Sequence, residues 1–181
     1  IAILDQKSQR LKILIEDLFE ASKAASGNME LITEEIDVVA LMKQTLGELE
    51  EKINRSNLQF KINMPEEKVI CNLDGRRTYR IFENLIGNAL KYSAPYSRVY
   101  IDIQAGEEVS IIFKNMSAYE MNFTAEEITE RFKRGDESRH TEGSGLGLAI
   151  AKSLTELQDG RLEIFIDGDL FKVIVKFKGI I

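Results

Sequence analysis

The order of helical and strand-like segments between residues 29 and 177 constrains the fold more than any other feature of this sequence. Apolar side chains recur at helical spacing in some segments and alternate with polar ones in others. Strands are predicted at 29–36, 58–62, 68–73, 98–104, 109–114, 161–166 and 170–177, and helices at 37–54, 75–92 and 146–157, with a short helix after Thr124. This order predicts a two-layer α/β sandwich, a mixed sheet with its helices stacked on one face.

The first 26 residues form a separate helical pattern. Apolar and small side chains follow one another at alternating spacings of three and four, as in a heptad seam: Ile1, Leu4, Ser8, Leu11, Ile15, Leu18 and Ser22. Such a narrow seam favours one arm of a helix bundle over the alternative, an amphipathic helix lying on its own domain. Gly27 is a natural end for this helix, so we divide the chain into a bundle helix at 1–26 and a domain at 27–181. Because the pattern is already helical at Ile1, the sequence is expected to be a piece of a longer protein.

Charge and cysteine content exclude several classes of function. The chain has 24 Lys and Arg against 30 Asp and Glu, a net charge of −6, which argues against nucleic-acid binding through a basic surface. Its one cysteine, Cys71, lies in an apolar run and is expected to be a buried thiol in a reducing compartment. No stretch approaches the ~20 apolar residues that span a bilayer.

The predicted helix 75–92 carries polar side chains at unusual positions. Asn84, Asn88 and Lys91 follow one another at i, i+4 and i+7, so they share one stripe of the helix. Helix interiors disfavour asparagine, and amide oxygens suit a magnesium–phosphate site to which Lys91 would add a positive charge. The alternative is a polar patch that caps nearby loops.

A glycine-rich turn precedes the predicted helix 146–157. In Gly143-Ser144-Gly145-Leu146-Gly147 the glycines let the backbone approach a ligand, and the N–H groups at the helix start form an anion site. The turn is not a Walker A loop, which ends in Gly-Lys-Ser/Thr, and Leu148 stands where the dinucleotide fingerprint needs glycine. The turn alone is a weak signal of phosphate binding, but together with the asparagine stripe it is a strong one.

Taken together, the asparagine stripe and the glycine-rich turn resemble motifs of the ATP-binding domain of sensor histidine kinases. This domain belongs to the superfamily that includes DNA gyrase, the ninety-kilodalton heat-shock chaperone and MutL. Residues 84–93 resemble the family's asparagine box, 130–135 its phenylalanine box and 143–152 its second glycine box. Residues 4–31 resemble the second helix of the dimerisation bundle that carries the phosphorylated histidine. The resemblance implies a Bergerat-type fold that binds ATP and Mg²⁺ between the asparagine helix and a flexible lid at about 116–144.

The resemblance also implies roles for individual residues. Asn88 matches the magnesium-holding asparagine, Asn84 its partner one turn earlier, Lys91 a phosphate-contacting lysine and Tyr92 the aromatic residue beside the nucleotide. Asn84, Asn88 and Lys91 are therefore the expected catalytic residues. The other nucleotide contacts that it implies are Asn115, Phe132, Arg134, Arg139, Gly143, Ser144, Gly145, Leu146, Gly147 and Leu148.

One box departs from the family pattern. The first glycine box is usually Asp-x-Gly-x-Gly, with the aspartate accepting from the adenine amino group, and here its place is taken by Asn115-Met116-Ser117-Ala118-Tyr119. An asparagine still accepts through its amide oxygen but carries no charge. Ser117 and Tyr119 replace both glycines, so the backbone need not follow the usual course. We expect a retained but altered adenine contact; the alternative is a non-catalytic nucleotide- or partner-binding module of the same fold.

The reaction implied by the resemblance is phosphoryl transfer to a histidine. The gyrase and chaperone branch activates water with a glutamate at the position of Asn84, and Glu83 is turned about 100° away around the helix, which disfavours a hydrolytic ATPase. The only histidine, His140, lies in the predicted lid and is not assigned the acceptor role. The acceptor is therefore expected on a missing upstream helix, with relay to the receiver domain of a response regulator. The resemblance further implies a homodimer through the N-terminal helix and a cytoplasmic domain of a bacterial sensor whose membrane contact lies upstream.

Overall fold

The structure, a computed structural model, describes residues 11, 12, 15, 16, 18, 19, 22, 23, 26, 29–121 and 146–180 of the chain. Their elements are, in order, β1 (Glu34–Asp37), α2 (Val38–Glu48), α3 (Glu50–Arg55), β2 (Gln59–Asn63), β3 (Ile70–Leu73), α4 (Gly75–Tyr92), β4 (Arg98–Gln104), β5 (Glu108–Met116), α6 (Gly147–Leu157), β6 (Arg161–Asp167) and β7 (Leu170–Lys178). The expected short helix after Thr124 lies outside the described residues.

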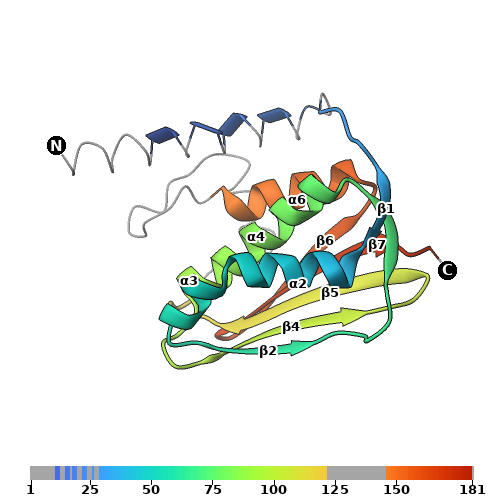
Figure 1. Cartoon of the computed structure of the whole chain (residues 1–181). Helices are drawn as coiled ribbons and strands as arrows, with labels where there is room; N and C mark the ends of the chain where they lie inside the picture. The colour runs from blue at the N-terminus through green and yellow to red at the C-terminus, as the bar shows by residue number, and fades with distance from the viewer. Residues whose placement is uncertain are drawn as a thin grey trace.

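The main sheet has five strands in the order β2-β4-β5-β7-β6. Strand β2 pairs with β4 in parallel, and the other neighbours are antiparallel. Strands β1 and β3 form a separate two-stranded sheet. Helices α2, α4 and α6 lie over one face of the main sheet (Figure 1). The predicted two-layer sandwich with a mixed sheet is therefore confirmed.

The core lies between the main sheet and the helices. Every second residue of β5, beginning at Val109, is buried, and the same alternation runs through β4 and β7. From the helix layer, α4 contributes Ile81, Phe82, Leu85 and Ile86, each at most 3% exposed. Full burial of such an aliphatic or aromatic side chain stabilises the fold by roughly 1.5–3 kcal/mol.

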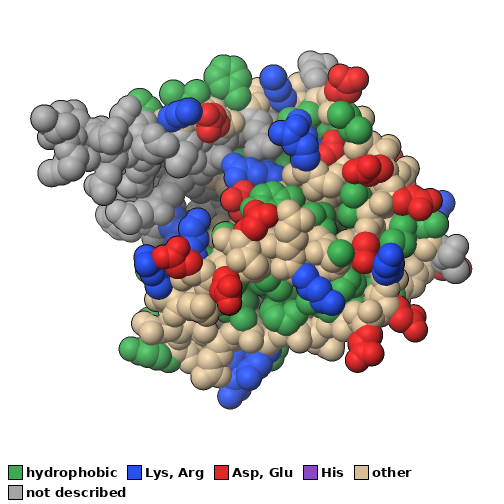
Figure 2. Space-filling model, in the orientation of Figure 1, with side chains coloured by type: hydrophobic (Ala, Val, Ile, Leu, Met, Phe, Trp, Pro, Cys, Tyr) green, Lys and Arg blue, Asp and Glu red, His purple; other side chains and the backbone are tan. Residues whose placement is uncertain are grey.

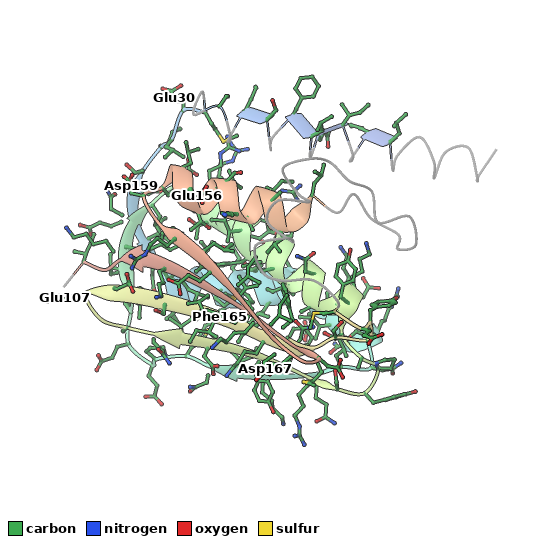
Figure 3. The ribbon with its side chains drawn as sticks, turned by 180° about the vertical axis from the view of Figure 1, so that it is seen from behind. Glu30, Glu107, Glu156, Asp159, Phe165 and Asp167 are labelled. Carbon is green, nitrogen blue, oxygen red and sulfur yellow. The ribbon has the colours of Figure 1, made fainter. Side chains whose placement is uncertain are left out.

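No helix of the described residues covers the opposite face of the sheet, which Figure 3 shows from behind. Phe165 of β6 is 45% exposed there, and the Lys172 Nζ lies 4.6 Å from the centre of its ring. Asp167 at the end of β6 and Glu107 between β4 and β5 lie toward opposite ends of the sheet (Figure 3). At the Asp167 end of the strands, Met116 of β5 pairs with Leu170 of β7.

Helix α4 begins and ends where the sequence predicted. Asp74 precedes it with extended backbone, and its Oδ1 accepts a hydrogen bond from the Arg77 N–H at 3.0 Å. An N-cap of this kind satisfies one of the free N–H groups of the first turn. At the other end, Ser93 is again extended, and Lys91 in the last turn carries the charge that the helix dipole favours.

Two elements differ from the prediction. The expected helix 37–54 is broken at Leu49, whose backbone leaves the helical region (φ −96°, ψ 2°), because this turn buries the Leu49 side chain to 6% exposure. The expected strand 29–36 is confined to Glu34–Asp37, since only these residues pair with β3. Apolar spacing continues through both regions, so periodicity alone did not reveal either change.

Asp74 connects three parts of the chain, and we call this contact the Asp74 junction. Its Oδ2 accepts from the Ile32 N–H at 3.0 Å, which holds the segment before β1 against the start of α4. Its own N–H donates to Gln158 Oε1 at 2.8 Å, at the end of α6. Asp74 is 6% exposed, so the start of α4 and the end of α6 are joined by buried hydrogen bonds.

Acidic and basic side chains are interspersed with hydrophobic ones on the face shown in Figure 2, so neither sign of charge dominates it. Among the described residues, we find no helix with the length and apolar character needed to cross a bilayer.

Cys71 is buried in β3, as predicted, and burial raises the pKa of its thiol to about 11 from 9.0. We expect a thiol reagent at pH 8 to leave the native chain unlabelled and to label it fully in denaturant, because only an exposed thiolate reacts. Since the folded pKa is the higher one, the thiol contributes stability below pH 9 that is lost as the pH rises toward 11. Urea midpoints of wild type and Cys71→Ala between pH 8 and 11 measure this loss. Rapid labelling of native protein would contradict the prediction.

Candidate functional site

The asparagine stripe of α4 lies at the border of the core. Ile81, Leu85 and Ala89 are buried on one side of it, while Asn84 and Asn88 are half-buried. The two carboxamides therefore sit where an apolar surface meets an accessible one. Such a position lets an amide meet a ligand without the full cost of burying an unpaired polar group.

The start of α6 meets this stripe. A Cβ atom built on Gly147 would lie 3.0 Å from Asn84 Oδ1 and 3.5 Å from Asn88 Oδ1. The two asparagines and Gly147, about 60 residues apart in sequence, thus come together at one point. The absence of a side chain at Gly147 leaves the space into which both amide oxygens point.

A hydrogen bond fixes how the Asn84 carboxamide is turned. Its Nδ2 donates to the Arg80 carbonyl at 2.8 Å, one turn back along α4, and this leaves Oδ1 facing Gly147. Sequence reasoning missed this contribution of Arg80, although bonds from a side chain to a carbonyl four residues earlier are common for polar residues inside helices.

The converging oxygens fit a hard cation shared with phosphate. Mg²⁺ takes oxygen ligands and is usually bound through one or two protein groups together with water and phosphate. Within the described ranges, no cluster of three or more His, Cys, Asp or Glu side chains is placed to hold a metal ion. The Asn84 and Asn88 oxygens are therefore the described groups best suited to Mg²⁺.

The first residues of α6 have two roles, one for their backbone N–H groups and one for their side chains. Among the described residues, no side chain caps this helix, and the N–H groups of a first helical turn are groups that bind anions. Leu146 is half-buried, and Leu148 is 4% exposed in the core. The Leu148 side chain is thus part of the packing, and only its backbone is placed for the predicted nucleotide contact.

Lys91 and Tyr92 interact with each other at the end of α4. The Lys91 Nζ donates to the Tyr92 hydroxyl at 2.9 Å and lies 4.7 Å from the centre of its ring. The Tyr92 ring in turn meets Tyr119 edge-on, with centroids 6.5 Å apart. Lys91 and Tyr92 are both half-buried, and the hydroxyl and ring of Tyr92 hold the ammonium group at the end of α4.

The altered glycine box lies at the end of β5. Asn115 is 6% exposed and belongs to the helix-facing row of the strand. Ser117 Oγ donates to the Tyr119 carbonyl at 2.8 Å and lies 3.1 Å from the Tyr119 nitrogen, whose N–H donates to it. Neither residue has a positive φ, so this turn does not need the two glycines of the family pattern.

Glu83 is directed away from this contact. Its carboxylate pairs with Arg80 at 2.6 Å along α4, whereas the atoms nearest a Gly147 Cβ are amide atoms of Asn84 and Asn88. The position of Glu83 agrees with the helical-wheel argument that it does not face the phosphate site.

The remaining predicted contacts fall where the structure gives no description. These are Phe132, Arg134, Arg139, Gly143, Ser144 and Gly145, together with His140 and most of the expected lid. Tyr119, by contrast, was not predicted as a site residue, and the serine–tyrosine turn that positions it gave no recognisable signal in the sequence.

Comparisons with known proteins give a consistent picture. Residues 73–178 match the family described as histidine kinase-, DNA gyrase B-, and HSP90-like ATPase. The chain is 32% identical over 151 residues to the sensor protein VanSC of Enterococcus gallinarum, covering 82% of this chain and 42% of VanSC. The chain thus spans less than half the length of that curated relative.

Solved structures share the fold. Full-length ShkA in complex with AMPPNP superimposes with a TM-score of 0.77 at 19% identity, covering 98% of this chain and 38% of ShkA. The histidine kinase ThkA in complex with the response regulator protein TrrA superimposes with a TM-score of 0.76 at 20% identity, covering 99% of this chain and 50% of that one.

Proposed function

This chain belongs to the histidine kinase-, DNA gyrase B- and HSP90-like ATPase family, and from that membership we propose that it is the ATP-binding catalytic part of a sensor histidine kinase. In this proposal it transfers the γ-phosphoryl group of ATP to a histidine on an upstream helix. Similarity to the sensor protein VanSC supports this branch of the family over the gyrase and chaperone branches.

The single observation that carries the proposal is the contact between α4 and α6. Two amide oxygens lie next to Gly147, in the first turn of α6, which no side chain of the described residues caps. The amides suit Mg²⁺ and the N–H groups suit phosphate, so one small region offers ligands for both parts of a magnesium–nucleotide complex.

Each described residue then has a defined task. Asn88 and Asn84 hold the cation through Oδ1, with Asn84 kept in place by the Arg80 carbonyl. Lys91, held by Tyr92, brings a positive charge to the phosphates. Bound ATP with Mg²⁺ supplies the phosphoryl group, and the protein contributes positioning and charge stabilisation.

The same residues favour phosphoryl transfer to a histidine over hydrolysis of ATP by water. An amide at position 84 cannot accept a proton from water, and the Glu83 carboxylate is held by Arg80. Slow hydrolysis preserves ATP until an acceptor histidine reaches it.

The N-terminal segment supports the proposed dimer. Leu11, Ile15 and Leu18, three members of the heptad seam, are 47–59% exposed in the single chain. Apolar side chains at this spacing are covered when helices pair, so we propose that they lie in the bundle of a homodimer. The full protein would pass the phosphoryl group to a response regulator and would be anchored in the membrane by segments upstream, with this part in the cytoplasm.

Isothermal calorimetry with a non-hydrolysable ATP analogue and Mg²⁺ tests the proposal. We expect saturable one-site binding that EDTA weakens. In Gly147→Ala, binding should fall by about tenfold or more, because the new methyl group fills the space between the two amides. The matched control is Gly47→Ala, where a Cβ meets nothing within 4 Å.

A second candidate is a non-catalytic module of the same fold. It is favoured by Asn115, Ser117 and Tyr119, which stand where the family pattern has one acid and two glycines. No binding of the ATP analogue by the folded domain would support this candidate and overturn the kinase proposal.

A further inference from the structure

A row of basic and aromatic side chains crosses the outer face of the main sheet, the face opposite the helices. Each member is the register partner of the next, and every strand contributes one residue to what we call the basic–aromatic row: Lys61, Tyr100, Lys114, Lys172 and Phe165. No helix of the described residues covers this row, and Phe165 marks one end of it in Figure 3. Its charged members are all cationic, so it forms a positive band on an acidic chain.

Apolar surface is accessible along the basic–aromatic row. Phe165 is 45% and Tyr100 36% exposed, and Met116, in the last position of β5, is 41% exposed. The Lys114 Nζ lies 5.3 Å from the centre of the Tyr100 ring, and Lys172 makes the corresponding contact with Phe165. The lysine stems therefore lie along the sheet, so that rings and ammonium groups are presented together.

The lysines of this row are less neutralised than a lysine elsewhere on the outer face. Lys114 pairs with Asp102 at 3.0 Å, but within the described ranges neither Lys61 nor Lys172 forms an ion pair. By contrast, Lys176, four residues further along β7, contacts two carboxylates at 3.0 and 3.7 Å. Two of the three lysines in the row thus carry a charge that no neighbouring acid offsets, and they are available to an external anion.

The outer face as a whole is positive, although the chain is negative. Side chains on this face alternate along the strands with those packed in the core. Seven of them are basic and four are acidic, namely Lys61, Arg98, Lys114, Arg161, Lys172, Lys176 and Lys178 against Asp102, Glu108, Glu163 and Asp167. Because the net charge of the chain is −6, an anionic partner is attracted to this face and repelled by the rest of the surface.

The extent of the face favours an anionic lipid surface over an acidic protein segment. The basic–aromatic row crosses five strands, which is roughly 19 Å at about 4.8 Å between neighbouring strands. Arg98 of β4 and Met116 of β5 widen it along the strand direction. An extended peptide follows one line and would leave much of this area uncovered, whereas a bilayer surface meets all of it at once. Basic and aromatic side chains are also those that proteins place among lipid headgroups.

We propose that the outer face of the sheet docks on the anionic phospholipids of a membrane surface through the basic–aromatic row. The rings of Tyr100 and Phe165 enter the headgroup region, and the three lysines pair with lipid phosphates. Helices α4 and α6 lie on the other side of the sheet, so the asparagine stripe stays accessible (Figure 1). This contact goes beyond the proposed function and does not depend on nucleotide binding.

Cosedimentation with lipid vesicles measures this contact in the whole chain. We expect the chain to bind vesicles of phosphatidylglycerol and phosphatidylcholine in about equal parts at low ionic strength, and to bind pure phosphatidylcholine about tenfold or more weakly. Raising the salt concentration should release it from the anionic vesicles, because exposed charges are screened.

Two double charge reversals locate the binding surface. Lys61→Glu with Lys172→Glu should weaken binding to the anionic vesicles by about tenfold or more. The matched control is Lys43→Glu with Lys52→Glu, at exposed positions of α2 and α3 in the helix layer. Both variants make the chain more negative by the same amount, so general repulsion from the vesicles affects them equally.

The outcomes are distinct from those of the kinase proposal. Absence of wild-type binding to the anionic vesicles would overturn the inference and favour an acidic protein segment as the partner of this face. Equal binding to both kinds of vesicle, or an equal loss in the two double variants, would also overturn it. The wild-type comparison needs no variant to fold. Calorimetry with the ATP analogue is a separate measurement, and the Lys61 and Lys172 variant should bind the analogue as wild type does.

Discussion

Replacing Asn88 with Ala is expected to weaken binding of ATP with Mg²⁺ by on the order of 100-fold, because a hydrogen bond or ligand bond to a charged group is typically worth about 1.5–3 kcal/mol. Asn88 Oδ1 is one of the two amide oxygens that face Gly147. Its removal leaves the cation with Asn84 as the one remaining amide of the pair. The thermal midpoint should stay close to wild type or rise slightly, since Ala is the better helix former by roughly 0.5 kcal/mol.

Calorimetry and thermal unfolding of the same samples separate the two effects. Asn54→Ala is the matched control, because Asn54 is an exposed asparagine inside helix α3. It should change neither the affinity nor its dependence on Mg²⁺. If Asn88→Ala bound the analogue as tightly as wild type, the cation would not be held at this stripe, and the assignment of Asn84 and Asn88 would be wrong.

Much of the fold followed from periodicity because its elements are amphipathic. Strands β4 and β5 alternate strictly between buried and more accessible residues, and α4 has a clear apolar stripe between an Asp cap and Ser93. These local signals agree with the tertiary structure, so the predicted bounds of this helix, 75–92, match those of α4. The break at Leu49 and the pairing of β1 with β3 depend on contacts between distant segments, which no local pattern contains.

The candidate site was predictable in its residues but not in its geometry. Asn84, Asn88 and Gly147 each stand out in the sequence, yet their convergence depends on α6 running antiparallel to α4. The turn of the Asn84 amide depends on the Arg80 carbonyl, and the burial of Asn115 depends on its row in β5. Side-chain orientation is thus the part of the site that only the structure supplied.

Replacing Asp74 with Ala is expected to destabilise the fold by about 2–4 kcal/mol and to lower the thermal midpoint by about 5–15 °C. The change removes the N-cap bond to the Arg77 N–H and leaves the Ile32 N–H without its acceptor. Both bonds are at least partly buried, so water replaces them poorly. The bond that ties the end of α6 to the start of α4 is donated by the backbone N–H of Asp74, so Asp74→Ala retains it and should leave these two helices packed together.

Two further variants test how much of this loss of stability is specific to the Asp74 carboxylate. Asp74→Asn keeps an oxygen for the cap but presents an NH₂ group to the Ile32 N–H, so it should lose roughly 1–2 kcal/mol, a value between those of wild type and Ala. Asp37→Ala, which removes a half-buried cap with longer bonds of 3.1–3.4 Å, should cost less than Asp74→Ala. Urea unfolding measures all three, and equal losses for Asp74→Ala and Asp37→Ala would contradict a special role for the junction.

Measuring ATP binding by the same variants completes the test. Asp74 lies about 21 Å along α4 from Asn88, at roughly 1.5 Å per residue. Asp74→Asn should therefore bind ATP with Mg²⁺ within about threefold of wild type at a temperature where it is fully folded, since it touches none of the proposed ligands. A large loss of affinity in folded Asp74→Asn would mean that the junction sets the position of Gly147 against the asparagine stripe. The pair of measurements thus decides whether Asp74 contributes to stability alone or also to the geometry of the nucleotide site.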